Sequence, residues 1–281
     1  MTKKVIIASD STTDLTPELI EKYNIKVLPL GVNLGDKLYT DGVDINPDMI
    51  YAHYEQTGEL PKTSAINTVQ AVEFFKEHTA DGSAMVFFTI SSEMSCTYAN
   101  ARLAAEEFEN VYVVDTRSLS TGGGLLVLAA ADMAKDGMSA REIAEKCAKL
   151  TDKIVASFVV DDLTFLHKGG RCSALAAIGA NLVHIKPCIG VSGGKMSVVK
   201  KYRGSFGAVL KKYTAELLEE GCADLSRVLV THAGCDEELI EQCVSQVKDA
   251  LPFEDVIVAR AGCTISSHCG KNTLGILFMK R

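Results

Sequence analysis

The sequence predicts an α/β protein made of two α/β domains, residues 1–151 and 152–281. Up to about residue 150, short apolar runs alternate with stretches of helical periodicity, which indicates a largely parallel sheet flanked by helices. Several of the apolar runs end in loops rich in Ser, Thr and Asp, and ligands of open α/β sheets bind at such strand ends. The pattern changes from Lys153 onward, where we expect a second α/β domain that includes a hairpin.

The strands expected in the first domain are short. They cover Val5–Ala8, Lys26–Val32, Lys37–Thr40, Ala84–Phe88 and Val111–Val114. Two helices are expected after Thr16-Pro17 and Asn46-Pro47, because each pair places a capping side chain before a proline. Periodicity predicts further helices at Val69–His78, Tyr98–Glu107, Leu125–Lys135 and Ala140–Leu150, and Pro61–Ser64 is expected to be a loop.

In the second domain, the expected hairpin joins Lys186–Val191 to Met196–Tyr202 through a Gly-Gly turn. The other expected strands are Ile154–Val160, Val228–Thr231, Asp255–Arg260 and Leu274–Lys280. Helices are expected at Ala174–Val183, Phe206–Leu218 and Leu239–Ala250, with a short segment at Leu163–His167. The first of these helices is rich in Ala and Gly, so it could lie close to another backbone or to a ligand.

Composition argues against several classes of protein. A net charge of −7 gives no sign of a nucleic-acid partner. Apolar runs stay well short of the roughly 20 residues of a membrane span, so we expect no span and at most a transient membrane contact. Nine cysteines without a Cys-x-x-Cys pair indicate reduced thiols, and Ser9-Asp10 interrupt the apolar start that a signal peptide would need. A cytoplasmic protein is therefore expected.

The hydroxyl-rich turn Thr89–Ala101 lies between a predicted strand and a predicted helix. A helix N-terminus at the end of a strand offers unpaired N–H groups to an anion, and Ser95 could add a hydroxyl donor there. Ser95 could equally be an ordinary helix cap, a role in which serine is common. The two interpretations are about evenly balanced on this stretch alone.

Other motifs give weaker signals. Gly122–Gly124 lacks the spacing of a nucleotide-binding loop, which favours close packing of a helix on a sheet. Lys168–Arg171 is either a solvated basic turn or a site for a phosphate or an acidic partner. Cys263, His268 and Cys269 are too few for a metal site. Aspartates at strand ends could bind a cation but more often cap helices or form turns, and they are Asp10, Asp14 and Asp115. Sequence alone assembles no Ser-His-Asp triad.

Six segments, taken in order, resemble the DegV family of bacterial fatty-acid-binding proteins from end to end. They are Ser9-Asp10-Ser11-Thr12-x-Asp14-Leu15, Pro61-Lys62-Thr63-Ser64, Ile90-Ser91-Ser92-x-x-Ser95-x-Thr97-Tyr98, Val114-Asp115 with Ser120-x-Gly122-x-Gly124, Leu166-x-Lys168-Gly169-Gly170-Arg171, and Ser267-His268 before the last strand. Each segment is unspecific by itself, whereas their number and order make the match strong.

The resemblance implies two α/β domains that bury an acyl chain and hold its carboxylate where they meet. It implies a non-catalytic carrier with no metal or cofactor, which binds a long-chain fatty acid and presents it to a separate kinase subunit for phosphorylation, feeding phospholipid synthesis. Thr63 and Ser95 match the hydroxyls that bind the carboxylate, and His268 matches a histidine beside it. Arg171 and Arg203 match basic positions that engage the kinase or the acyl-phosphate.

The chain departs from the family pattern at three places, which are Cys96 in place of Gly, Ala65-Ile66-Asn67 without the usual Pro, and Cys269-Gly270-Lys271-Asn272 in place of a Gly-Pro-Gly-like turn. Two other functions remain open. One is a kinase or transferase subunit of the fold shared with part of the dihydroxyacetone kinases, acting on a small hydroxylated substrate. The other is a lipid-sensing regulatory protein, which would use the same pocket.

Overall fold

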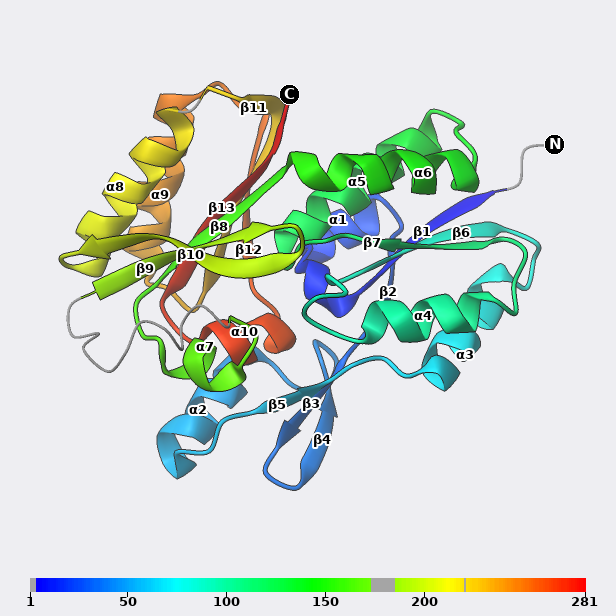
Figure 1. Ribbon diagram of the computed structural model, residues 1–281, viewed down its shortest axis with the longest axis horizontal. Coiled ribbons are helices and arrows are strands. Elements are labelled where there is room, and N and C mark those ends of the chain that lie inside the picture. Colours follow the sequence, from blue (N-terminus) through cyan, green and yellow to red (C-terminus); the bar gives the residue numbers. More distant parts are fainter. Residues whose placement is uncertain (1–3, 173–184, 220) are drawn as a thin grey trace.

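The computed structural model describes residues 4–172, 185–219 and 221–281, and it confirms the predicted α/β fold. Strands in this part of the chain form a four-stranded, a six-stranded and a three-stranded sheet. The two larger sheets lie side by side along the long axis of the molecule (Figure 1), and the three-stranded sheet lies below their junction in that view. The helix predicted at Ala174–Val183 falls outside the described residues.

The four-stranded sheet is parallel, as predicted. Its order is β2 (Lys26–Leu28), β1 (Val5–Asp10), β6 (Ala84–Thr89) and β7 (Val111–Asp115). All six side chains of β6 are buried, because helices cover both faces of the sheet. One face packs on α1 (Pro17–Lys22), α5 (Thr121–Lys135) and α6 (Ala140–Leu150), and the other on α3 (Thr68–Thr79) and α4 (Thr97–Ala105).

The three-stranded antiparallel sheet was not predicted as such. It contains β4 (Lys37–Thr40), β3 (Gly31–Leu34) and β5 (Lys62–Ser64), with α2 (Pro47–Thr57) between β4 and β5 in the chain. The single strand predicted at Lys26–Val32 is wrong, since β2 and β3 belong to different sheets. Pro29 lies between them and has no N–H for a ladder bond, so the chain leaves one sheet there and enters the other. The loop predicted at Pro61–Ser64 is also wrong, because it contains β5.

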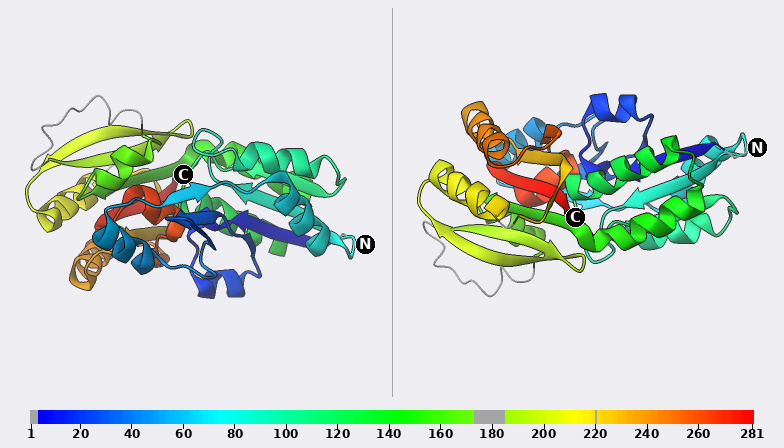
Figure 2. Two further views of the ribbon diagram at one scale, coloured as in Figure 1. Left: turned by 90° about the horizontal axis from the view of Figure 1, so that it is seen from below. Right: turned by 90° about the horizontal axis from the view of Figure 1, so that it is seen from above.

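The six-stranded sheet is mixed. Its order is β10 (Lys195–Arg203), β9 (Ile185–Ser192), β8 (Ile154–Val160), β13 (Thr273–Lys280), β11 (Ala223–Ala233) and β12 (Asp255–Arg260). The predicted hairpin is confirmed as β9–β10, and both glycines of its turn, Gly193 and Gly194, have a positive φ. α8 (Phe206–Glu219) and α9 (Glu237–Ala250) cover one face of the sheet (Figure 2).

The opposite face of this sheet carries two short helices, α7 (Thr164–Gly169) and α10 (Cys263–Cys269). We predicted no helix at α10. It contacts α7, α2, β3, β5 and the 3₁₀ turn η1 (Ser11–Thr13), so a late segment of the chain packs among early ones. The boundary expected between residues 151 and 152, within the 3₁₀ turn η2 (Thr151–Lys153), stays a prediction.

The three glycines 122–124 are confirmed as packing residues. α5 begins at Thr121 rather than at Leu125, so all three lie inside the helix. A Cβ atom on Gly124 would lie 2.8 Å from the carbonyl oxygen of Thr13. Across the described ranges, no helix combines the length and the hydropathy needed to cross a bilayer.

Candidate functional site

A cavity of about 320 Å³ lies where α10, β5 and the loop after β6 meet, and we call it the junction cavity. Four of the five residues proposed from the family resemblance line it, namely Thr63, Ser95, Arg171 and His268. Its other described lining residues are Leu30, Ala65, Ile90, Met94, Cys96, Leu119, Met196, Thr264, Ile265 and Cys269. The described lining therefore includes one arginine and several apolar side chains but neither Asp nor Glu.

Thr63 and His268 are in direct contact, although 205 positions separate them in the sequence. The Thr63 Oγ1 and His268 Nε2 atoms are 2.9 Å apart. β5 places Thr63 opposite Val32 of β3, and α10 brings His268 onto the same side. The other ring nitrogen, His268 Nδ1, is buried without a hydrogen-bond partner among the described residues. A Cβ atom on Gly169 would lie 2.7 Å from Nδ1, so the end of α7 packs directly over the imidazole.

Burial, together with the smaller effect of the nearby positive charge of Arg171, lowers the pKa of His268 to about 4. The imidazole is therefore neutral at physiological pH, and it offers a carboxylate a hydrogen bond rather than a charge. Arg171 is the cationic side chain of the described lining.

The depressed pKa of His268 predicts a pH dependence of stability. An unfolded chain binds a proton at this histidine near pH 6.5, whereas the folded chain does so only near pH 4. Acid therefore favours the unfolded state, and stability is lost as the pH falls below 6.5. Between pH 7 and pH 5 we expect the wild type to lose about 2 kcal/mol relative to His268→Gln, since 1.36 kcal/mol corresponds to one pKa unit.

Urea unfolding of both proteins at the two pH values measures this difference. His167→Gln, at an exposed histidine of α7, is the control for loss of an imidazole elsewhere. An equal loss in the wild type and in His268→Gln would show that His268 is not neutralised by burial.

Ser95 contacts the first residue of α4 and lines the junction cavity. Its Oγ accepts a hydrogen bond of 3.2 Å from the Thr97 N–H at the start of α4, and lies 3.0 Å from Thr97 Oγ1. The N-cap of α4 is Cys96 and carries no side-chain cap bond, so Ser95 supports the first N–H of the helix from one residue before the cap, and its role toward a ligand stays a prediction. Cys96 has a φ of −79°, which any residue adopts, so replacing the family's usual glycine does not require a changed backbone path.

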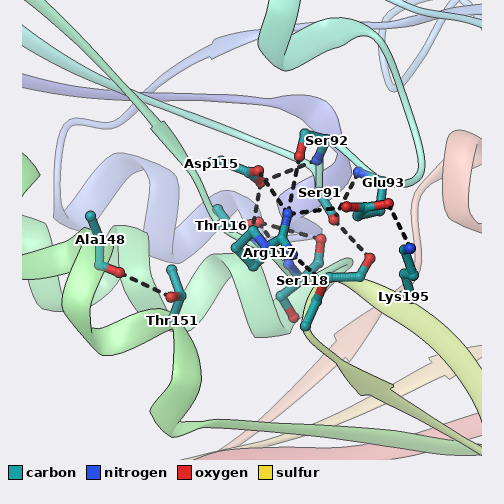
Figure 3. A network of polar contacts seen from close by, with 12 residues as sticks. Ser91, Ser92, Glu93, Asp115, Thr116, Arg117, Ser118, Ala148, Thr151 and Lys195 are labelled. Carbon is teal, nitrogen blue, oxygen red and sulfur yellow. Dashed lines mark hydrogen bonds and ion pairs between the residues drawn. The ribbon is translucent and has the colours of Figure 1, made fainter.

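Arg117 anchors the loop after β6 to the β9–β10 turn (Figure 3). Its guanidinium bonds the carbonyl oxygen of Gly193, donates to Ser92 Oγ at 3.3 Å and pairs with Glu93 at 3.5 Å. Lys195, also in the turn region, pairs with Glu93 at 3.3 Å. Sequence reasoning missed Arg117; its only signal was a position in the polar loop that follows β7. These contacts tie the Ser95 loop to the six-stranded sheet.

Three aspartates lie buried near the junction cavity, namely Asp10, Asp14 and Asp41. Burial raises the pKa of Asp10 to about 6, with hydrogen bonds from Thr12 and Ile90 acting against it, and raises the pKa of Asp14 well above its ordinary value. Both were considered as cation ligands. Within residues 4–172, 185–219 and 221–281, no group of three or more His, Cys, Asp or Glu side chains is arranged to hold a metal ion.

The two arginines assigned to partner contact occupy different places. Arg171 lines the junction cavity, and its Nη1 donates a hydrogen bond of 2.8 Å to the carbonyl oxygen of Gly169. Arg203 is exposed at the end of β10 and is not among the lining residues. Arg171 is thus available to the head group as well as to a partner.

Comparisons with known proteins agree with the resemblance seen in the sequence. The model of the DegV family matches residues 4–281. A DegV domain-containing protein of Clostridium perfringens is 31% identical over 288 residues, which cover 99% of this chain and 98% of the relative. A DegV domain-containing protein of Caldanaerobacter subterraneus is 29% identical over 282 residues, which cover 99% of this chain and 100% of the relative.

Solved structures give the same result. A DegV family protein from Thermus thermophilus, described for its fatty acid binding, superposes with a TM-score of 0.91 at 27% identity. The superposition covers 99% of this chain and 100% of the Thermus chain. A stearic-acid-binding protein from Eubacterium ventriosum gives a TM-score of 0.82 at 27% identity, covering all of this chain and 98% of its own.

Proposed function

The chain belongs to the DegV family, and from this premise we propose that its junction cavity binds the carboxylate of a long-chain fatty acid. One observation carries the proposal: the described lining brings the hydroxyls of Thr63 and Ser95, a neutral imidazole and a guanidinium together against an apolar wall, with no acidic side chain. Such a lining suits an anionic head group on an aliphatic chain. Relatives described as fatty-acid-binding and stearic-acid-binding proteins support the same ligand class.

A second cavity adjoins the apolar side of the junction cavity. A smaller cavity of about 30 Å³ shares Leu119, Ile265 and Cys269 with the junction cavity and continues toward the six-stranded sheet, beside Phe158 and Leu277. Burying a chain of about fifteen methylenes stabilises a complex by on the order of 12 kcal/mol before the costs of association. The chain then supplies most of the affinity, and the head group determines where the carboxylate lies.

We further propose that the protein is a carrier, which presents the bound fatty acid to a separate kinase subunit. The solvent-exposed Arg171 and Arg203 would contact that partner or the acyl-phosphate, because a guanidinium binds phosphate through paired hydrogen bonds. A kinase needs the carboxylate at a fixed point, which hydrogen bonds from Thr63, Ser95 and His268 would provide.

Native mass spectrometry of the purified protein, followed by organic extraction, tests the ligand class. We expect a fatty acid in the extract, or stoichiometric uptake of added oleate. A bound nucleotide or phosphosugar would instead favour an enzyme of the dihydroxyacetone-kinase-like fold. Incubation with ATP and oleate should yield no acyl-phosphate until a kinase subunit is added, and turnover by the protein alone would contradict the carrier role.

Arg171→Ala is expected to weaken oleate binding by roughly three- to tenfold, because it removes a partly screened charge from the carboxylate site. Lys168→Ala removes an exposed cation from the same segment but outside the described lining, and should leave the affinity unchanged. Arg203→Ala should lower only the kinase-coupled rate. Titration with oleate measures the affinities, and equal values for Arg171→Ala and Lys168→Ala would exclude Arg171 from the head-group site.

A further inference from the structure

The short helix α10 supplies one face of the junction cavity. Thr264, Ile265, His268 and Cys269 all line the cavity, and their spacing places them on adjacent turns of the same side of the helix. A small rotation or shift of α10 would therefore move His268 away from Thr63. What holds the helix in place determines the geometry of the site.

The N-terminus of α10 has no local cap. Its capping position is Gly262, which has no side chain to accept hydrogen bonds from the first turn. Asp14 and Asp41, from the early part of the chain, accept those bonds instead. Asp14 Oδ1 accepts from the Gly262 N–H at 2.9 Å, and the two Asp41 oxygens accept from the N–H groups of Cys263 at 2.8 Å and Thr264 at 3.0 Å.

Asp41 is the more fully engaged of the two. It is 4% exposed, and besides the two N–H groups it accepts hydrogen bonds from Thr264 Oγ1 at 2.6 Å and from Ser11 Oγ at 3.0 Å. Four donors use about all the lone pairs that a carboxylate offers. In a carboxylate both oxygen atoms accept hydrogen bonds. An asparagine of the same size would replace one of them with an NH₂ group, which would face one of these donors.

Residues at the end of β1 and directly after it hold two other parts of the site. Asp10 Oδ2 accepts a hydrogen bond of 2.8 Å from the Ile90 N–H, at the start of the loop that carries Ser95. Ser11 Oγ, while donating to Asp41, also accepts from the Leu30 N–H at 3.1 Å, and Leu30 lines the cavity. Residues 10–14 therefore contact α10, the start of the Ser95 loop and Leu30, although they are not among the described lining residues themselves.

We propose that Asp41 is a positioning residue for the fatty-acid carboxylate site, because it caps α10 and so holds His268 against Thr63. Asp14 shares this cap, and Asp10 acts in the same way on the Ser95 loop. The inference rests on the proposed function for the identity of the ligand. The part that concerns how Asp41 holds His268 against Thr63 applies to the ligand-free protein. It also gives a physical reason for the acidic and hydroxyl residues at the end of the first strand and directly after it, which are not among the described lining residues of the junction cavity.

Asp41→Asn tests the proposal, with Asp48→Asn as its matched control. Asp48 also joins the early part of the chain to the late part, through an exposed ion pair with Arg260, and Arg260 lies outside α10. Two readouts are compared. One is the dissociation constant for oleate, and the other is the ring ¹H–¹⁵N spectrum of His268 in the ligand-free protein, which reports the hydrogen bond to Thr63.

We expect Asp41→Asn to weaken oleate binding by roughly tenfold and to shift the His268 ring signals, while Asp48→Asn leaves both at wild-type values. Identical readouts for the two variants would overturn the proposal. If the wild type itself fails to bind oleate, the proposed function is wrong, and the His268 signals still decide the inference. If Asp41→Asn does not fold, Ser11→Ala removes a single donor to Asp41, and a shift of the same signals supports the proposal whereas unchanged signals overturn it.

Discussion

Ala65→Trp is expected to reduce the affinity for oleate by roughly a thousandfold or more. Ala65 lines the junction cavity next to β5 and is only partly buried, so an indole there fills the cavity without displacing a core side chain. Each methylene kept out of the protein costs about 0.8 kcal/mol, and losing the burial of about six of them costs on the order of 5 kcal/mol.

Ala99→Trp is the control, because Ala99 is exposed on α4 and does not line the cavity. The sequence contains no tryptophan, so the emission of the introduced residue reports its own surroundings. We expect a blue-shifted emission for Ala65→Trp that oleate does not change. Wild-type affinity in Ala65→Trp would place the acyl chain elsewhere.

The double change Thr63→Val with Ser95→Ala is expected to weaken oleate binding at least a hundredfold. A hydrogen bond from a hydroxyl to a carboxylate contributes roughly 1.5–3 kcal/mol, so each single change should cost about ten- to a hundredfold. The kinase-coupled rate should fall by a larger factor than the affinity, because the buried chain retains the ligand while the carboxylate loses its fixed position. Calorimetry and a coupled phosphorylation assay measure the two quantities.

Thr97→Val is the control for the hydroxyl contact between Ser95 and the start of α4. It removes the hydroxyl that contacts Ser95 at the start of α4, and Thr97 is not among the described lining residues. If Ser95→Ala and Thr97→Val have the same effect on affinity and rate, the loss arises from the hydroxyl contact at the start of α4 and not from a bond between Ser95 and the carboxylate. If Thr63→Val and Ser95→Ala both keep wild-type values, the assignment of the carboxylate site is wrong.

The sequence patterns predicted the layers of the fold better than its connections. β6 and the helices around it follow from apolar runs and periodicity, because burial on both faces leaves a strong signal. The split of the second predicted strand at Pro29 was missed, since both halves are apolar and a proline in a run also fits an edge strand. β5 was missed because a strand of three residues beside a proline resembles a loop.

α10 was missed for a different reason. Its residues, Cys263–Cys269, are mostly poor helix formers, and its cap comes from Asp14 and Asp41, more than 200 residues away in the sequence. Local signals therefore argue against a helix that tertiary contacts stabilise. The same holds for the candidate site: its residues were named through the family resemblance, but the contact between Thr63 and His268 could not be derived from spacing, because it depends on this helix.

The packing of α10 among early segments also bears on how the protein is made. Domains generally fold from the N-terminus as the chain is synthesised. Here the early strands and helices can form before α10 exists, yet the pair Thr63–His268 is separated by 205 positions and closes only when that late helix arrives. A nascent chain would thus expose the unfinished pocket until nearly all of these 281 residues have been added. During that time its apolar wall would be uncovered, and Asp14 and Asp41 would lack the N–H groups of α10 that they bind in the folded protein. Ligand capture should then follow synthesis rather than accompany it.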